Sequence, residues 1–363
     1  MEPTLVDGLE VNAYTIPTDG LESDGTLEWN RTTIVIVEAS AAGVRGLGYT
    51  YADVSTARLV ATTLSATVTG CDAMAPNRAF GRMLGAVRNL GQVGIAAMAI
   101  SAVDTALWDL KARLLGVPLA TLFGQVRTAA SIYGSGGFTS YPIDTLQRQL
   151  ADWVRQGIGA VKMKIGREPA ADPRRIAAAR DAIGTDAALF VDANGAYTRK
   201  QALAIGDHLV AQAVRWYEEP VSSDDLEGLR LIRDRAPAGI DVAAGEYAFE
   251  IGAFARMLAA GAVDVLQADA TRCGGYTGFL QAAALCEAQR IPLSSHCAPA
   301  LHVPIACAAR PFVHAEYFVD HARIERMLFD GANEPRGGVI EPDLDRPGHG
   351  LALRRDVARR YAA

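Results

Sequence analysis

Residues 160–194 read AVKMKIGREPAADPRRIAAARDAIGTDAALFVDAN, and this stretch decides the fold. It opens on a short run of β-type residues at 160–165, continues through an alanine-rich stretch of helical composition, and returns to a second β-type run at 188–192. Short strands that alternate with helical stretches are typical of βαβ units in a parallel sheet. The stretch therefore predicts one βαβ unit, with charged residues at the carboxyl end of each strand.

The same alternation extends in both directions along the chain. Eight β-type runs are separated by seven stretches, most of them helical in pattern, which predicts a parallel β/α barrel. A doubly wound open sheet is the structural alternative, but no G-x-G-x-x-G motif follows the first run. The eight runs are 129–133, 160–165, 188–192, 214–218, 241–244, 263–267, 291–294 and 312–316.

The first 125 residues have a different texture. Residues 32–38 are rich in β-branched side chains and are predicted to form a strand. Residues 56–68 and 93–115 are predicted to form helices, the second of which ends near Gly116-Val117-Pro118. An α+β segment is therefore predicted to precede the barrel.

Polar and charged residues recur at the carboxyl ends of the predicted strands. From one strand to the next the spacing is 20–28 residues, about one βα unit, so these residues occupy equivalent places on successive strands. In a barrel that place is the mouth, where active sites are built. Solvated strand ends are the alternative, although they need not repeat with so narrow a choice of residue types. The residues are Lys162, Lys164, Asp192, Asn194, Glu218, Glu246, Asp269, His296 and Glu316.

Three acidic residues, Asp192, Glu218 and Glu246, end three successive strands. Converging carboxylates repel one another unless their pKa values rise or a cation neutralises them. A hard divalent cation is the simplest solution, and Mg²⁺ suits a site with a few carboxylates and positions left for water or substrate. We therefore predict a Mg²⁺ site at these residues; surface acids that never meet are the alternative.

Two lysines, Lys162 and Lys164, lie at positions i and i+2 of one strand and so face the same side. Two ammonium groups in one enclosed space are expected to lower one another's pKa, and burial is expected to lower both. A lysine tuned in this way can act as a base near neutral pH. Solvated lysines on an edge strand are the alternative, which the apolar neighbours Val161 and Ile165 argue against.

His296 follows the run at 291–294, and Asp269 follows the preceding strand. An aspartate bonded to one ring nitrogen fixes the tautomer and raises the basicity of the other nitrogen, so the pair is a candidate acid/base dyad opposite the lysines. A lone histidine here would more often be structural. Cys297 is expected to point away by strand alternation and is not interpreted as a nucleophile. The remaining histidines, without a comparable partner, are interpreted as structural or surface residues: His208, His302, His314, His321 and His349.

Seven short strings around these residues occur in order at barrel spacing, and together they resemble the mandelate racemase-like subgroup of the enolase superfamily. An eighth string, residues 102–112, is similar to that family's segment just before the barrel. The resemblance covers nearly the whole chain. The seven strings are Val161-Lys162-Met163-Lys164, Val191-Asp192-Ala193-Asn194-Gly195, Tyr217-Glu218-Glu219-Pro220, Ala244-Gly245-Glu246, Gln267-Ala268-Asp269 with Cys273-Gly274-Gly275, Ser295-His296-Cys297-Ala298-Pro299, and His314-Ala315-Glu316-Tyr317.

The resemblance implies an α/β fold, a modified (β/α)7β barrel of the TIM type with an N-terminal α+β capping domain. We accordingly expect the capping domain at 1–125, the catalytic barrel at 126–322 and a C-terminal segment at 323–363 that returns to the capping domain. The resemblance also implies a role for each site residue. Asp192, Glu218 and Glu246 would bind Mg²⁺, Lys164 would be one base, Lys162 would touch the substrate carboxylate, His296 with Asp269 would be the acid/base on the opposite face, and Glu316 would hydrogen-bond the substrate carboxylate.

The implied chemistry is removal of the proton next to a carboxylate through an enediolate. Mg²⁺, Lys162 and Glu316 would hold the second negative charge where it develops. If the substrate carries a β-hydroxyl that His296 protonates as it leaves, the reaction is dehydration of a sugar acid, an aldonate or aldarate, which is the preferred interpretation. Racemisation or epimerisation, lactone cycloisomerisation, and a non-catalytic sugar-acid or metal-binding barrel are the alternatives.

Substrate specificity in this family is expected from loops of the capping domain, which we place at 18–29 and 48–51. Trp29 and Tyr51, together with Asn194 from the barrel, are the candidate substrate-binding residues. The polar residues Asp19, Glu22 and Asp24 suit a hydroxylated substrate, and ordinary solvated loops are the alternative.

Composition limits the classes of partner. The 363 residues include 35 Lys and Arg against 41 Asp and Glu, a net charge of −6, which gives no basic surface for nucleic acid or an anionic membrane. Residues 1–7 do not read as a signal peptide, and residues 94–108 are too short and too charged to span a bilayer. Five cysteines without a C-x-x-C pair suit free thiols in a reducing compartment. We therefore expect a cytoplasmic homo-oligomer that acts on a small-molecule carboxylate, with neither a nucleic-acid nor a membrane partner.

Overall fold

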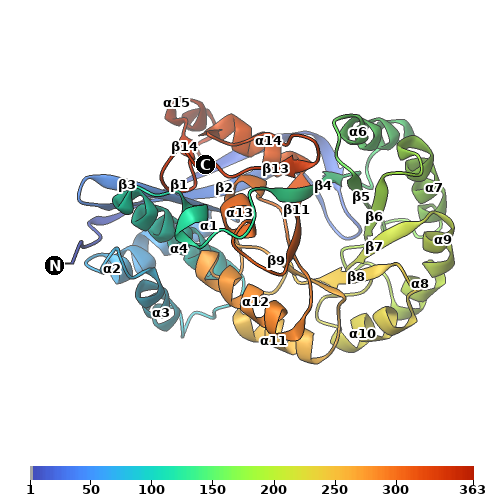
Figure 1. Cartoon of the computed structure of the whole chain (residues 1–363), viewed down its shortest axis with the longest axis horizontal. Coiled ribbons are helices and arrows are strands. Elements are labelled where there is room, and N and C mark those ends of the chain that lie inside the picture. Colours follow the sequence, from blue (N-terminus) through green and yellow to red (C-terminus); the bar gives the residue numbers. More distant parts are fainter. Residues whose placement is uncertain (1–2) are drawn as a thin grey trace.

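Short apolar runs form a closed barrel of parallel strands. The computed structural model describes residues 3–363, and within them β4 to β11 pair in chain order, each parallel to the next. The sheet closes because β11 also pairs with β4 in parallel, which excludes the doubly wound alternative and confirms the predicted barrel (Figure 1). The barrel strands are β4 (Ala130–Gly136), β5 (Ala160–Lys164), β6 (Ala188–Asp192), β7 (Val214–Glu218), β8 (Asp241–Ala244), β9 (Val265–Ala268), β10 (Leu293–Ser295) and β11 (Phe312–Phe318).

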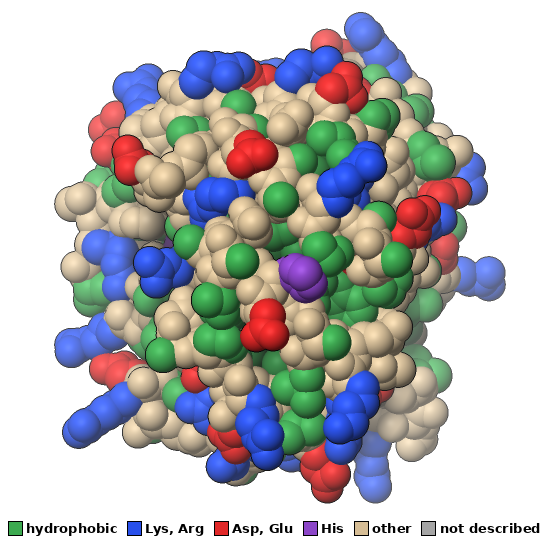
Figure 2. Space-filling model, turned by 90° about the vertical axis from the view of Figure 1, so that its right-hand side faces the viewer, with side chains coloured by type: hydrophobic (Ala, Val, Ile, Leu, Met, Phe, Trp, Pro, Cys, Tyr) green, Lys and Arg blue, Asp and Glu red, His purple; other side chains and the backbone are tan. Residues whose placement is uncertain are grey.

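Helices connect these strands and cover the outside of the barrel (Figure 1). Helix α6 shows the pattern that allows this, because Leu146, Leu150 and Trp153 recur at helical spacing and are buried on its inner face. On the outer face that Figure 2 presents, cationic and anionic side chains are interspersed. The connecting helices are α6 (Ile143–Arg155), α7 (Asp172–Ile183), α8 (Arg199–Ala204), α9 (Gly206–Ala211), α10 (Leu226–Arg235), α11 (Ile251–Ala259), α12 (Gly275–Gln289) and α13 (Pro299–Ala306).

The N-terminal part is an antiparallel sheet packed on helices, as predicted for an α+β segment. Its strands are β1 (Gly8–Ser23), β2 (Glu28–Ala41) and β3 (Val44–Tyr51), and its helices are α1 (Ser55–Leu59), the π-helix η1 (Val60–Leu64), α2 (Ser65–Val68), α3 (Pro76–Ala86), α4 (Ile95–Leu115) and α5 (Leu119–Leu122). The helix predicted at 93–115 is α4, whereas the one predicted at 56–68 is divided by the π-helix.

The expectation that residues 18–29 and 48–51 form loops is wrong for most of these residues, which lie in strands. Most of the first is a β-hairpin formed by the ends of β1 and β2, and the second belongs to β3. A register shift between Pro17 and Glu22 interrupts the pairing of β1 with β2. The alternation of apolar and polar residues that would identify a strand in the sequence is therefore lost at this point. At the hairpin tip, a Cβ atom on Gly25 would lie 2.4 Å from Ala193 O, so the tip rests directly on the mouth of the barrel.

Strand β3 crosses helix α4 with almost no side chain between the two backbones. A Cβ atom added to Gly46 would lie 2.2 Å from Leu110 N, and one added to Gly48 would lie 2.3 Å from Ala102 O. Only glycine allows this approach, and the small side chains of Ala102 and Ala106 on α4 complete it. The close crossing helps to bury α4 along most of its length.

Helix α4 also reaches into the barrel. Its Asp104 is fully buried and accepts hydrogen bonds from Thr277 N at 2.9 Å and Thr277 Oγ1 at 2.6 Å, in the first turn of α12. The side chain thus caps a barrel helix from the N-terminal segment. A second buried contact joins the same two parts, since Tyr49 Oη of β3 donates to Glu325 Oε1 at 2.5 Å on α14 (Val319–Leu328).

The C-terminal tail returns to the N-terminal sheet. Ala363 N donates to Ala13 O at 3.0 Å, and Tyr14 forms a β-bridge with Ala362. The division into segments 1–125, 126–322 and 323–363 stays a prediction. The tail contains β12 (Phe329–Asp330), β13 (Val339–Ile340), β14 (Ala352–Leu353), α15 (Arg355–Ala358) and the 3-10 helix η2 (Arg359–Tyr361).

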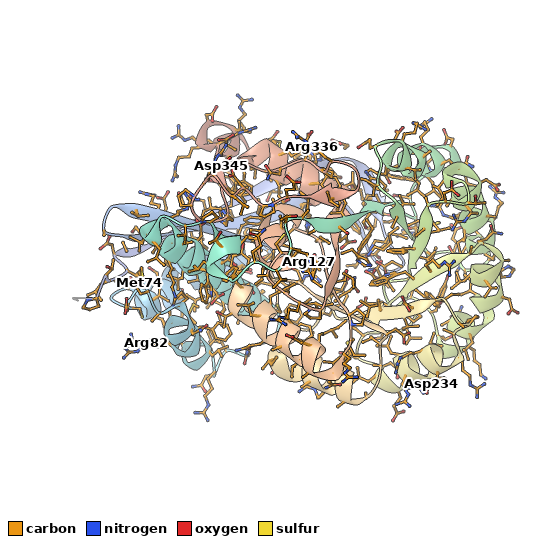
Figure 3. All side chains as sticks on the ribbon, viewed as in Figure 1. Met74, Arg82, Arg127, Asp234, Arg336 and Asp345 are labelled. Carbon is orange, nitrogen blue, oxygen red and sulfur yellow. The ribbon has the colours of Figure 1, made fainter. Side chains whose placement is uncertain are left out.

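One partly buried arginine helps to fasten the start of the barrel to its end. Arg127, labelled in Figure 3, precedes β4 and donates to Ala306 O, to Ala309 O at 2.6 Å and to Arg310 O at 3.0 Å.

All five cysteines lie among the described residues and are free thiols, as expected. Over residues 3–363, no helix combines the length and apolarity needed to cross a membrane.

Replacing Asp104 with Asn is expected to flatten the dependence of stability on pH. Burial raises the pKa of Asp104 to about 7, although the hydrogen bonds from Thr277 favour the ionised form. Because aspartate in an unfolded chain has a pKa of about 3.9, the folded protein holds an extra proton, and its stability falls as pH rises from about 4 to about 7. Each tenfold change in proton affinity is worth about 1.4 kcal/mol.

The measurement is the melting temperature between about pH 5 and about pH 8. Asp104→Asn should lose part of the downward slope, because its amide keeps a hydrogen-bonding group toward Thr277 without titrating. The matched control is Asp234→Asn, at an exposed position of α10 (Figure 3), which should keep the wild-type slope. Identical slopes in wild type and Asp104→Asn would contradict the role given to this carboxyl.

Candidate active site

A cavity of about 460 Å³ opens at the carboxyl ends of the barrel strands. The barrel contributes its floor, and the hairpin of β1 and β2 together with the end of β3 contributes its roof. Seven of the predicted site residues line it: Lys164, Asn194, Glu246, His296, Glu316, Trp29 and Tyr51. A larger hollow of about 750 Å³ lies over the first turns of α6 and α7 and contains none of the predicted site residues.

Three carboxylates meet at the floor. Strand pairing places Lys164 beside Asp192 and Asp192 beside Glu218, so these side chains share one level of the barrel. Glu246 follows Gly245, whose φ of +138° suits only glycine and whose Cβ, if present, would lie 2.1 Å from Gln267 O. One oxygen each from Asp192, Glu218 and Glu246 lies within 4.8 Å of the others. The trio predicted from the sequence therefore converges.

These carboxylates fit a hard divalent cation. Glu246 Oε2 is buried and accepts no hydrogen bond among the described residues, which leaves a free oxygen ligand. Burial and the nearby Asp192 raise the pKa of Glu218 to about 8. The positive charges near the cluster therefore do not balance its buried carboxylates. An all-oxygen donor set with these properties is what Mg²⁺ prefers.

The two lysines face the carboxylates. Lys162 Nζ is completely buried and contacts Glu218 Oε1 at 2.6 Å and Glu316 Oε1 at 2.8 Å, so it lies beneath the cavity. Lys164 Nζ contacts Asp192 Oδ2 at 2.5 Å and lines the cavity wall.

The expected lowering of the lysine pKa values is wrong for this arrangement of charges. Burial does oppose both ammonium ions, and the charge of Lys162 does lower the pKa of Lys164. The carboxylates outweigh these effects, and the pKa of each lysine stands above its ordinary value. The sequence pattern identified the two ammonium groups but not the number of acids packed around them.

His296 and Asp269 form the predicted pair. His296 Nδ1 lies 2.8 Å from Asp269 Oδ2, and both side chains are buried. Burial works against the imidazolium, but Glu246 and the hydrogen bond that His296 donates to Asp269 raise the pKa of His296 above its ordinary value. His296 Nε2 lies 3.3 Å from Glu246 Oε2, so the free ring nitrogen points toward the carboxylate trio.

The expectation that Cys297 points away from His296 is wrong. The backbone at Cys297 has a φ of +51°, and that at Ala298 has a φ of +41°, so strand alternation ends at His296. Cys297 Sγ consequently lies 3.2 Å from His296 Nε2 and lines the cavity. His302 stabilises this turn, since its Nδ1 lies 3.0 Å from Cys297 O and its Nε2 accepts from Ala270 N at 2.8 Å.

Both carboxylate oxygens of Glu316 accept hydrogen bonds. Oε1 accepts from Ser135 Oγ at 2.6 Å, and Oε2 accepts from Cys297 N at 2.8 Å. Burial favours the neutral acid, but the charges of Lys162, His296 and Lys164 keep the pKa of Glu316 well below its ordinary value. The carboxylate is therefore ionised and fixed in orientation at the cavity wall.

The predicted roof residues are fixed by neighbours that the sequence did not reveal. Trp29 Nε1 donates to Glu22 Oε2 at 2.8 Å. Tyr51 stacks on His321 with ring centroids 3.4 Å apart, and His321 itself lines the cavity. His321 was interpreted as structural or surface, and no local pattern connects it with Tyr51 across 270 positions.

Arg272 is another residue of the site that sequence reasoning missed. It lines the cavity with NH1 3.6 Å from Glu246 Oε1 and Nε 3.7 Å from Asp269 Oδ2, and its guanidinium lies over the ring of Tyr247. The available signal was its place three residues after Asp269, in the string that ends in Cys273-Gly274-Gly275. The remaining predicted site residues are not among those that line the cavity: Lys162, Asp192, Glu218 and Asp269.

Fold and cavity together define a capped β/α barrel whose mouth brings a carboxylate cluster together with lysine and histidine groups. Residues 23–124 match the family model of the mandelate racemase/muconate lactonizing enzyme N-terminal domain, and residues 145–357 match that of the enolase C-terminal domain-like family. The chain therefore belongs to the mandelate racemase/muconate lactonizing enzyme family of the enolase superfamily.

Three relatives illustrate the family. A mandelate racemase/muconate lactonizing enzyme-like protein from Rubrobacter xylanophilus has 55% identity and a TM-score of 0.96, with 99% of each chain covered. The 3,6-anhydro-alpha-L-galactonate cycloisomerase of Streptomyces coelicolor is 32% identical over 96% of this chain and 97% of its own. The L-talarate/galactarate dehydratase of Salmonella typhimurium is 32% identical over 90% of this chain and 82% of its own. A structure of the latter with Mg and L-lyxarohydroxamate has a TM-score of 0.89, covering 99% and 93% of the two chains.

Proposed function

We propose that this protein is a Mg²⁺-dependent enzyme that removes the proton next to the carboxylate of a sugar acid and then expels the β-hydroxyl as water. The observation that carries the proposal is one cavity with a carboxylate trio at its floor and proton-transfer groups from two separate strands, β5 and β10. A binding protein needs no such groups on two sides of its ligand, which argues against the non-catalytic alternative.

Asp192, Glu218 and Glu246 would hold the ion. When bound, Mg²⁺ supplies positive charge that neutralises these carboxylates and stabilises the second negative charge that develops on the substrate carboxylate. With its neighbours neutralised, Lys164 can release its proton and accept the one next to the substrate carboxylate. Lys162 lies below the same point and adds a fixed positive charge, while Glu316 orients Lys162 and the backbone of Cys297.

His296 would act from the other side of the cavity. Asp269 holds its Nδ1, so that the proton for the leaving hydroxyl is carried on Nε2, and the raised pKa of His296 keeps that proton available. Loss of the β-hydroxyl with this proton forms water and leaves an enol, which becomes a ketone when its β-carbon takes up one proton and its O–H group releases another. The roles of the two groups are proposals on the basis of their placement in the cavity.

Lactone cycloisomerisation is the second candidate, and it is favoured by the relative from Streptomyces coelicolor. It would use the same proton abstraction but break the bond from the β-carbon to a ring oxygen, which stays in the product, instead of expelling water. Racemisation or epimerisation would result if Lys164 and His296 exchanged protons on opposite faces of one carbon.

The deciding experiment is a screen of aldonates, aldarates and their lactones with Mg²⁺ in D₂O, followed by mass spectrometry and proton NMR. Dehydration is expected to lower the product mass by one water and to produce a keto acid. An isomer with a new C–D bond, whose mass differs from the substrate only by incorporated deuterium, would establish cycloisomerisation, and deuterium at the α-carbon of an acid with inverted configuration would establish racemisation or epimerisation. If no acid exchanged its α-proton, the proposal would fail.

Replacing Trp29 or Tyr51 with Ala is expected to change substrate preference more than Mg²⁺ affinity. Both side chains line the roof, and neither belongs to the carboxylate trio. The measurement is kcat/KM on at least two acids beside the Mg²⁺ dissociation constant. Tyr14→Phe on β1 is the control, because Tyr14 is not among the cavity residues. An equal loss on every acid would make Trp29 and Tyr51 structural instead.

The homo-oligomeric state, the cytoplasmic location and the lack of nucleic-acid and membrane partners stay predictions from the sequence. A small-molecule carboxylate is the proposed partner. Arg272, Lys164 and His296 are the cationic groups by which a net-negative protein would attract it.

A further inference from the structure

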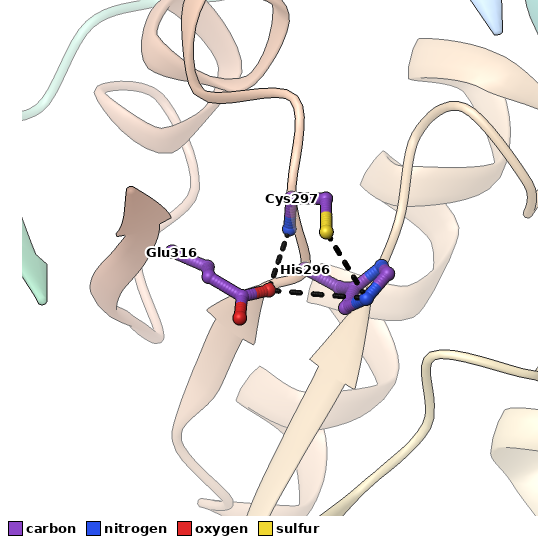
Figure 4. A group of neighbouring side chains, drawn as sticks. All are labelled: His296, Cys297 and Glu316. Carbon is purple, nitrogen blue, oxygen red and sulfur yellow. Dashed lines mark hydrogen bonds and ion pairs between the residues drawn. The ribbon is translucent and has the colours of Figure 1, made fainter. Parts of the chain in front are cut away.

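A second group of metal-binding side chains lies beside the carboxylate trio. His296, Cys297 and Glu316 each offer one ligand atom, these atoms lie within 4.8 Å of one another, and all three residues are buried. Figure 4 shows them converging from the end of β10, the turn that follows it, and β11. We propose that these three residues bind a borderline or soft divalent cation of the Zn²⁺ type, at a position distinct from that of the carboxylate trio.

The chemistry of the donors separates the two positions. The trio offers oxygen atoms alone, which suits Mg²⁺, whereas the second group offers an imidazole nitrogen, a thiol sulfur and one carboxylate oxygen. Thiolate and imidazole select Zn²⁺ and similar transition metals over Mg²⁺. Three protein ligands with an open fourth position is also the common arrangement of zinc in catalytic sites.

Two of the three separations between ligand atoms are close to those around a tetrahedral ion. Zinc–ligand bonds of about 2.0–2.3 Å at tetrahedral angles put neighbouring ligand atoms about 3.4–3.6 Å apart. Here Cys297 Sγ lies 3.2 Å from His296 Nε2, and His296 Nε2 lies 3.8 Å from Glu316 Oε2. Shifts of a few tenths of an ångström would bring these separations to the zinc values. The left-handed backbone at Cys297 is what brings the sulfur to this point.

The surroundings of the group are also those of a metal site. Asp269 binds His296 Nδ1, the partner that metal-binding histidines usually have on their second ring nitrogen, and this leaves Nε2 free for an ion. His296, Cys297 and Glu316 all line the open cavity, which provides a path for the ion.

Binding requires both the Cys297 thiol and Nε2 of His296 to lose their protons. Burial of the sulfur and the carboxylates of Glu316, Asp269 and Glu246 disfavour the free thiolate, so both protons leave to solvent as the bonds to zinc form. Zinc bound here would occupy the Nε2 of His296. If the proposed function holds, zinc is then an inhibitor that removes the acid/base histidine while Mg²⁺ stays in place.

The test uses binding, so it does not depend on the substrate or on the proposed reaction. Metal-depleted full-length protein in excess Mg²⁺ is dialysed against Zn²⁺, and bound zinc is counted by elemental analysis. About one zinc per chain is expected. With Co²⁺ in place of Zn²⁺, the near-ultraviolet absorption should show a thiolate-to-cobalt charge-transfer band, which only a sulfur ligand produces.

Cys297→Ser should abolish the band and weaken zinc binding by more than the roughly 10- to 100-fold that loss of an outer partner of a metal ligand typically costs. The control is Cys286→Ser, a buried thiol on α12 that is not among the cavity residues and should keep both signals. Zinc that Mg²⁺ displaces, a cobalt complex without the band, or equal binding by Cys297→Ser would each overturn the site. The wild-type cobalt spectrum remains a test even if Cys297→Ser fails to fold, because a complex without the band would overturn the site.

Discussion

Lys164→Ala is expected to stop both α-proton exchange and product formation, whereas His296→Asn is expected to stop product formation and leave exchange measurable. Lys164 and His296 end strands β5 and β10, which are separated on either side by other strands of the closed barrel, so the two groups approach a substrate from different directions. Lys164 is proposed to remove the α-proton, and His296 is proposed to protonate the leaving hydroxyl. Each loss should be about 10²–10⁴-fold, the usual contribution of a positioned acid or base.

The measurement is deuterium incorporation at the α-carbon, followed by NMR beside product formation, for both variants on one confirmed substrate. The matched controls are Lys200→Ala and His208→Asn at exposed positions, which should turn over at the wild-type rate. Loss of exchange in His296→Asn with exchange kept in Lys164→Ala would reverse the two roles. Wild-type turnover by both variants would exclude the mechanism.

Two further changes are expected to lower the rate strongly. They are Glu246→Gln and removal of the metal with a chelator. Glu246 provides an unpaired oxygen to the trio, and a neutral amide in its place offers a weaker ligand with no charge. A divalent ion stabilises the transition state of such a reaction by several kcal/mol, and every 1.4 kcal/mol is about tenfold in rate, so a loss of about 10²-fold or more is expected.

The measurements are the Mg²⁺ dissociation constant by calorimetry and the rate as a function of Mg²⁺ concentration. Chelated wild-type enzyme should recover its rate when Mg²⁺ is returned, and Glu246→Gln should need a higher concentration. Glu250→Gln, four residues away at the start of α11, is the control and should match the wild type. Full activity in metal-free protein would rule out the assignment of the trio.

Most of the fold could be predicted because each barrel strand is a short apolar run with its own signal. The runs predicted at 188–192, 214–218 and 241–244 coincide with β6, β7 and β8. The same regularity located the carboxylates, since parallel pairing brings the last residues of neighbouring strands to one level. Alternation failed where the backbone leaves the regular strand, at the register shift after Pro17 and at the left-handed turn of Cys297.

Other parts of the site depend on contacts between distant segments, which a single sequence does not show. The stack of Tyr51 on His321 joins β3 to α14, and the position of Arg272 between Asp269 and Glu246 depends on how two loops meet. The pKa of Lys164 was misjudged for the same reason, because it reflects a sum over several charges in three dimensions. Residue types at strand ends could be predicted, but the balance of charge around them could not.

The buried contacts between the N-terminal sheet and the barrel limit how this protein can be re-engineered. Trp29 and Tyr51 belong to the sheet, so an exchange of that sheet for a relative's is an obvious route to a new substrate. Such a chimera would take Tyr49 away from Glu325, whose buried carboxyl group would lose its hydrogen-bond donor, and it would have to keep Gly46 and Gly48 for the close approach to helix α4. The roof is therefore not an interchangeable module, and its side chains are better altered one at a time on the existing backbone.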